Sequence, residues 1–223
     1  MTKLDWGFGR VLSESKNNYH IGLVREALAA LGEGVRRCSK RIDDAHATGA
    51  DEFADAVTDE ECDVLETLLG SAFTVCQTHI AQVVADVHKL HKMAASPRDG
   101  NQGVKLRTTT KDKPDIMRHK CSQVPGTSVT VIEALNALAN YFKHRDEWPG
   151  DWTTATGQTA KTILVIKAIG LTQGSTGNLR RGATALGNPD FDKMNVFANL
   201  LEDWHVKFMA DYELELRNHC LVK

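Results

Sequence analysis

The sequence has few aromatic residues and no surplus of charge of either sign. Phe, Trp and Tyr make up 6% of its 223 residues, and the formal net charge is −2. A chain with so little net charge has no general electrostatic attraction for nucleic acid or for an anionic membrane. Any binding of that kind has to come from a local cluster of basic residues.

Cysteines and long apolar runs are also scarce. The five cysteines are odd in number and include no CxxC pair, a pattern typical of free thiols in a reducing compartment. No run of about 18 apolar residues stands out as long enough to span a bilayer. The first ten residues, MTKLDWGFGR, lack the apolar stretch of a signal peptide. We therefore expect a cytoplasmic protein with no membrane partner.

The motifs of several site classes are missing. There is no Gly-x-Ser-x-Gly elbow of a hydrolase. The stretch GSTGNLRRG, residues 174–182, has glycines and two arginines that could bind phosphate, but it lacks the ending of a P-loop. We interpret it as a connection between helices. The spacing of His88, His91, His119 and Cys121 matches no compact zinc finger. We predict no metal and no cofactor.

What the sequence does contain is apolar residues at the three- and four-residue steps of amphipathic helices. Two capping-box matches, Thr58 to Glu61 and Thr130 to Glu133, and an Asn188-Pro189 pair mark predicted helix starts. The fold class predicted is all-α, a single helical domain over 1–223 with about five helices and a long C-terminal helix. The expected helices cover residues 18–47, 58–93, 130–148, 159–168 and 189–221.

One segment, residues 96–127, has almost no helical periodicity and holds three of the five prolines. A connection of this length is unusual in a compact domain, so we expect a long mobile loop. Residues 96–120 carry seven Lys or Arg against three Asp. Phosphates could bind there, or the loop could face the acidic segment 42–66, which has ten acids and no Lys or Arg. The candidate nucleic-acid contacts are Lys105, Arg107, Lys111 and Lys113.

Four polar residues of the helix expected at 130–148 share one face. Glu133, Asn136, Asn140 and His144 are spaced by three, four and four residues, which stacks their side chains. The simplest interpretation is the water-facing half of an amphipathic helix. The alternative is a working site, because asparagine is a poor helix former and two occur one turn apart.

Two bases flank the histidine of this face. Imidazole titrates near neutral pH and can transfer protons, while neighbouring cations stabilise the charge of a phosphodiester under attack. The candidate catalytic residues are His144, Asn140, Lys143 and Arg145. The candidate supporting residues are Asn136, Glu133, Arg217 and His219. The last two are also explained as the basic end of the final helix.

The stretch ANYFKH, residues 139–144, resembles the late-helix motif of HEPN-domain proteins. Ribonucleases of that helical superfamily carry an arginine, a polar residue that is often asparagine, three further residues and a histidine. Asn140 and His144 stand at the matching positions, whereas Ala139 stands where the arginine would be.

This resemblance implies a bundle of four or five helices, a homodimer with two motifs in one cleft, and metal-independent RNA cleavage. With Ala139 in place of arginine, the resemblance leaves two possibilities, an RNA-directed effector of toxin or defence type that cuts RNA, or a catalytically degenerate relative. Either Lys143 or Arg145 supplies the cation for cleavage, or a degenerate relative binds RNA without cutting. The alternative from another class is a non-enzymatic module that docks on a protein partner or a second copy.

Overall fold

The described part of the chain is built from helices. The computed structural model describes residues 3–48, 51–96, 103–106 and 112–219, and for residues 3–8 the backbone alone. The elements in order are α1 (Lys3–Lys16), α2 (Tyr19–Ala47), α3 (Asp51–Ala95), α4 (Lys113–Arg118), α5 (Val131–His144), η1 (Arg145–Glu147), η2 (Trp152–Thr154), α6 (Gly157–Ala168), α7 (Asn178–Ala185) and α8 (Asn195–Asn218). The predicted all-α bundle with a long C-terminal helix is confirmed.

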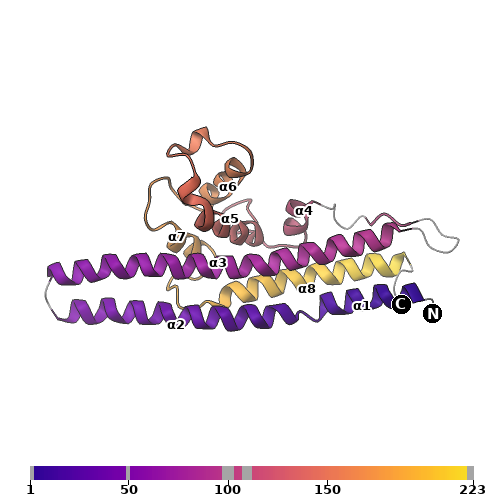
Figure 1. Ribbon diagram of the computed structural model, residues 1–223, viewed down its shortest axis with the longest axis horizontal. Coiled ribbons are helices and arrows are strands. Elements are labelled where there is room, and N and C mark those ends of the chain that lie inside the picture. Colours follow the sequence, from indigo (N-terminus) through magenta and orange to yellow (C-terminus); the bar gives the residue numbers. More distant parts are fainter. Residues whose placement is uncertain (1–2, 49–50, 97–102, 107–111, 220–223) are drawn as a thin grey trace.

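The helices form two groups on either side of α3 (Figure 1). Helices α1, α2 and α8 lie along one side of it, and α4 to α7 lie over the other. Helix α3 has 45 residues, a length of about 68 Å at 1.5 Å per residue. The turn end of the α2–α3 hairpin extends beyond the other helices (Figure 1). Helix α3 is therefore the element on which the short helices are positioned.

Helices α2 and α6 lie close to their predicted bounds, but α1, α4 and α7 were not predicted. Helix α1 contains Gly7 and Gly9, which are poor helix formers. It is separated from α2 at Asn18, whose φ of 49° lies in the left-handed region that asparagine adopts more readily than most residues. Its buried Val11 and Leu12 belong to the main core. Tertiary packing therefore stabilises a helix that the two glycines made difficult to predict from the sequence.

Two predicted helix starts were wrong. Helix α3 begins at Asp51, and Thr58 lies inside it with its hydroxyl donating to the Ala54 carbonyl at 2.7 Å. Helix α8 begins at Asn195, not after Asn188. The Asn188 side chain instead accepts from the Lys193 backbone N–H at 3.2 Å and stabilises the turn before the helix. Residues that cap helices also form local bonds elsewhere, so their sequence alone misleads.

The predicted loop at 96–127 includes one short helix and several buried side chains where the structure describes it. Leu106 and Ile116 are buried, and residues 113–118 form α4. Gln123 pairs with Thr130 in an isolated antiparallel bridge just before α5. The prediction of a structureless connection is therefore wrong for residues 113–118, whereas residues 103–106 have no regular secondary structure, although Leu106 packs into the core. The mobility of the segment stays a prediction. Residues 97–102 and 107–111 lie outside the described residues.

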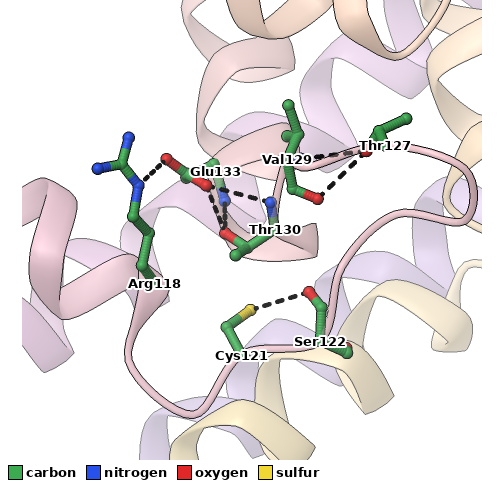
Figure 2. A network of polar contacts seen from close by, with 7 residues as sticks. All are labelled: Arg118, Cys121, Ser122, Thr127, Val129, Thr130 and Glu133. Atoms are coloured by element: carbon green, nitrogen blue, oxygen red, sulfur yellow. Dashed lines mark hydrogen bonds and ion pairs between the residues drawn. The ribbon is translucent and has the colours of Figure 1, made fainter.

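Helix α5 starts at the second capping box, as predicted. The Glu133 backbone N–H donates to the Thr130 hydroxyl at 3.3 Å, and the Thr130 N–H donates to the Glu133 carboxylate at 3.1 Å. Arg118 of α4 donates its Nε–H to the other Glu133 oxygen at 2.6 Å (Figure 2). This carboxylate therefore joins α4 to the start of α5.

Two glycines let α5 approach its neighbours closely. A Cβ at Gly70 of α3 would lie 2.0 Å from the Phe142 ring, and one at Gly182 of α7 would lie 2.4 Å from Leu138. Neither space can hold another carbon. Helix α5 is therefore held between α3 and α7 with the polar residues of its last turns in a defined position.

A buried carboxylate connects α3 to α7. The Glu66 oxygens accept from the backbone N–H groups of Leu179 and Arg180 at 3.0 and 3.1 Å, and from the Arg180 Nε–H at 3.2 Å. A carboxylate at this place satisfies two unpaired donors of a helix start and suits the positive end of the helix dipole. Residues 178–185, predicted as part of a connection, form a helix with this support.

Glu66→Gln is expected to lower the free energy of unfolding by about 2 kcal/mol, since an amide keeps one acceptor but loses the charge that faces Arg180. Chemical denaturation measures it. Glu60→Gln, an exposed position on the same helix, is the control and should change stability by less than about 0.5 kcal/mol. Equal stability of the two variants would contradict the structural role of Glu66.

Helix α3 contains an 18-residue window with a mean hydropathy of 1.3, apolar enough by length and composition to cross a membrane. The residue pattern had not suggested such a window. Half of it is buried inside the bundle. The central helix of a soluble bundle has this character as well, and α3 packs against α2, α5 and α8.

Candidate functional site

The polar face of α5 is directed at α3 and α4 rather than at water. Glu133 and Asn136 are 8% and 7% exposed, Asn140 is half-buried, and only His144 is exposed. The interpretation of this face as a water-facing half is therefore wrong for its first two members. They are buried because their hydrogen-bonding groups have partners on neighbouring elements, which a one-helix periodicity cannot reveal.

Five residues from three helices form what we call the amide–lysine cluster: Gln77, Lys113, Asn136, Asn140 and Lys143. The Gln77 side-chain amide donates to Asn136 Oδ1 at 3.0 Å and to Asn140 Oδ1 at 2.9 Å. Lys113 Nζ donates to Asn136 Oδ1 at 2.8 Å, and Lys143 Nζ donates to Gln77 Oε1 at 2.6 Å. The two asparagines one turn apart are thus bound by one glutamine.

The two lysines of this cluster contact amide oxygens rather than carboxylates. An ammonium group has three N–H donors, and each contact uses one of them. Burial lowers the pKa of Lys113, and the positive charge of Lys143 lowers it further. The repulsion between two cations that are held near each other disappears when an anion binds between them. The geometry therefore suits a phosphate group.

Ala139 is fully buried, so the position matching the motif arginine has no access to a ligand. The cations near Asn140 come from elsewhere. Lys143 reaches the Gln77 side chain that binds Asn140, and Lys113 arrives from α4. Lys113 was a predicted phosphate contact in the loop, and the structure brings it to the predicted α5 residues.

His144 and Arg145 lie at the exposed end of this site. His144 Nδ1 is 3.3 Å from Glu147 Oε2, and Arg145 Nε is 3.9 Å from Asp146 Oδ1. All four side chains are solvent-accessible, and the contacts lie within one turn of η1. His144 is therefore available to a ligand, but the described residues hold it only by this local contact.

The structure does not bring Arg217 and His219 to His144. Arg217 pairs with Glu213 at 2.7 Å, and His219 lies 3.8 Å from Glu215. Helix α3 lies beside both ends being compared. The last turns of α8 begin at Tyr212, which contacts His91 of α3, whereas the end of α5 lies near Gly70 of α3. Twenty-one residues of helix separate these points by about 30 Å. Within one chain these residues form no shared cleft with His144.

The other predicted nucleic-acid contacts are Lys105, Arg107 and Lys111. Lys105 is exposed in the short segment 103–106. Arg107 and Lys111 lie outside the described residues. Of the supporting residues, Glu133 has a structural role, since the capping box and Arg118 occupy both of its oxygens.

Three histidines that no sequence motif indicated, His20, His79 and His205, lie against one another at the core. The ring centroid of His79 lies 5.6 Å from that of His20 and 5.2 Å from that of His205. Both nitrogens of His79, and Nδ1 of His20 and His205, have no hydrogen-bond partner among the described residues. His79 and His205 occupy stripe positions, three residues after Cys76 and four after Leu201. That spacing was the signal that could have found them.

Metal binding has no arranged site in the described residues, where no group of three His, Cys, Asp or Glu side chains could hold an ion. Of the histidines considered for zinc, His91 packs against Tyr212 and His119 lies 2.7 Å from Asp211 Oδ2.

No protein-family model, curated protein or solved structure matches this chain. The resemblance to HEPN-domain proteins consequently stays a prediction, and the function has to be argued from the site.

Proposed function

We propose that this protein is a HEPN-like, RNA-directed protein that binds an RNA phosphate at the amide–lysine cluster. The observation that carries the proposal is the pair of lysines, Lys113 and Lys143, whose ammonium groups contact amide oxygens of the cluster and no carboxylate among the described residues. Their remaining N–H donors can bind phosphate oxygens, and a bound anion removes the repulsion between them.

Among the HEPN-like possibilities, we favour the degenerate relative that binds RNA without cutting it. Cleavage of the predicted type needs a cation at the phosphate and a histidine at the attacking hydroxyl. The position matching the arginine is buried Ala139, and His144 is held only by Glu147 on an exposed turn. Binding, by contrast, needs only the cations and amides that are already in contact.

All five cluster residues come from one chain, so a second copy is not required for the proposed binding. We favour RNA over an acidic protein segment as the partner because every nucleotide of RNA carries a phosphate, so an anion for the two lysines is present whatever the sequence. The toxin or defence setting implied by the resemblance remains a proposal of the same kind.

The double substitution Lys113→Gln with Lys143→Gln is expected to weaken binding of a short single-stranded RNA by about tenfold at low salt, because two phosphate contacts are lost. Fluorescence anisotropy of a labelled RNA measures it. The matched control is Lys161→Gln with Lys167→Gln, two exposed lysines of α6, which removes the same charge and should leave the affinity nearly unchanged. Equal loss in both double variants would mean that net charge, not this site, binds RNA.

Cleavage is tested in the same preparations by incubating RNA with the protein in chelator and comparing it with His144→Ala. We expect intact RNA in both. Cutting by the unsubstituted protein that His144→Ala abolishes would overturn the non-cutting assignment and restore His144 as the acid or base.

A further inference from the structure

A second candidate binding site lies on the other side of α5, in an open cavity of about 670 Å³. It is formed by the end of α6, the glycine-rich segment, α7 and the segment before α8. Drug-sized and cofactor-sized ligands bind in clefts of about 300–1,000 Å³. Its lining includes Ser175, Thr176, Arg180, Arg181, Thr184 and Phe191.

The cavity lining has two arginines, of which one forms an ion pair and the other, within the described part of the chain, does not. Arg180 donates to the Glu66 carboxylate at 3.2 Å and to the Cys62 thiol at 3.2 Å. Arg181 donates its Nη1–H to the Thr172 hydroxyl at 2.8 Å, a neutral partner. A guanidinium has five N–H donors, so most of those of Arg181 remain for a ligand. The cavity therefore presents an unneutralised cation beside three hydroxyl groups.

The start of α7 is not the anion site. Its Leu179 and Arg180 backbone N–H groups are taken by the Glu66 carboxylate, which has the charge that a phosphate would bring. A ligand anion is consequently expected at Arg181, in a cavity that Ser175 and Thr176 also line. The site therefore differs in kind from a P-loop, in which backbone amides surround the phosphate.

The apolar part of the cavity includes Ile169, Ala185 and Phe191. Phe191 has a φ of 63°. A bulky residue in the left-handed region is an outlier that costs free energy unless its surroundings hold it there. Its side chain is only half-buried. The cavity thus combines an aromatic wall with a cationic wall, as a ligand with a flat apolar part and a phosphate requires.

We propose that this cavity binds a small phosphate monoester with a planar base, that is, a free mononucleotide. Its phosphate contacts Arg181 and the hydroxyls of Ser175 and Thr176, and its base lies against Phe191 and Ile169. The inference uses none of the amide–lysine cluster and stands whether or not that cluster binds RNA.

The test is calorimetric titration of the full chain with adenosine monophosphate, adenosine and inorganic phosphate. Adenosine monophosphate is expected to bind more tightly than either part alone. Arg181→Gln should weaken it by about tenfold, since hydrogen bonds to a charged group are lost. Arg37→Gln, which removes an exposed arginine of α2, is the matched control and should leave its binding unchanged.

Three results would overturn the proposal. They are no binding of adenosine monophosphate, binding that Arg181→Gln leaves intact, and binding of adenosine that is equally tight.

A second experiment compares a short RNA that has a 5′-phosphate with the same RNA that has a 5′-hydroxyl. If only the phosphorylated RNA bound, the ligand would be an RNA end and the free mononucleotide would be wrong. Because Arg181 is exposed, equal thermal unfolding of the variant is expected and shows that folding is unaffected.

Discussion

Gly70→Ala is expected to destabilise the protein by about 3 kcal/mol, although alanine is a better helix former than glycine by about 1 kcal/mol. The new Cβ would lie 2.0 Å from Cδ2 and 2.3 Å from Cγ of Phe142. Because Cγ belongs to the base of the ring, rotation of the ring cannot relieve the contact. Helix α5 has to move away from α3, and the free energy of unfolding measured by denaturation should fall.

Gly22→Ala is the matched control for this substitution. Gly22 is also inside a long helix, and a Cβ there would meet nothing within 4 Å. Alanine should therefore stabilise the protein at this position by up to about 1 kcal/mol. Adding Phe142→Ala to Gly70→Ala should recover part of the loss, because it removes the ring that clashes. A Gly70→Ala protein as stable as the original would contradict the close approach of α5 and α3.

The second large effect is a loss of stability in acid that originates at His79. Burial, with the charges that His205 and His20 would carry, lowers the pKa of His79 from 6.5 to about 3. Burial also lowers the pKa of His205, against the opposing effects of the Ser15 backbone and Glu202. Between about pH 6.5 and pH 3, protons therefore bind His79 more readily in the unfolded chain than in the folded one.

The direction of the effect follows from that difference. Above about pH 6.5 both states hold neutral imidazole and the stability is at its full value. As the pH falls from 6.5 towards 3, His79 alone should cost about 1.4 kcal/mol per pH unit. At about pH 5 the loss is about 2 kcal/mol, measurable as a lower midpoint in urea.

His79→Leu should remove most of this loss of stability in acid, since an apolar side chain neither titrates nor leaves buried nitrogens unpaired. His88→Gln, an exposed position on the same helix, is the control and should lose as much stability in acid as the original protein. A His79→Leu protein that loses as much stability between about pH 7 and 5 as the original would show that other groups cause the acid sensitivity.

The residue pattern was sufficient to identify the long helices α2, α3 and α8, though not the starts of α3 and α8, because each has a continuous apolar stripe. The bounds of α2 and the capping box of α5 follow from local chemistry and were predicted well. Helices α4 and α7 are six and eight residues long, too short for a periodic signal. The carboxylate that supports the start of α7, Glu66, is more than a hundred residues away in the chain, so no local pattern could indicate it.

The candidate site was predicted in part for a similar reason. The stripe of Asn136, Asn140 and His144 could be identified from helical spacing, and Lys113 from the basic composition of its segment. That Lys113 contacts Asn136, and that Gln77 binds both asparagines, depends on how α3 and α4 pack against α5. Ala139 is fully buried, which explains why a side chain at this position does not reach a ligand.

The most direct test of the central claim, that the amide–lysine cluster binds RNA phosphate, is the salt dependence of RNA affinity. The slope of log affinity against log salt is about −0.7 for each phosphate contacted on a single strand. With Lys113→Gln and Lys143→Gln together, the slope should become shallower by about 1.4, the contribution of two phosphates. An unchanged slope in that variant, with binding retained, would contradict phosphate binding at this cluster.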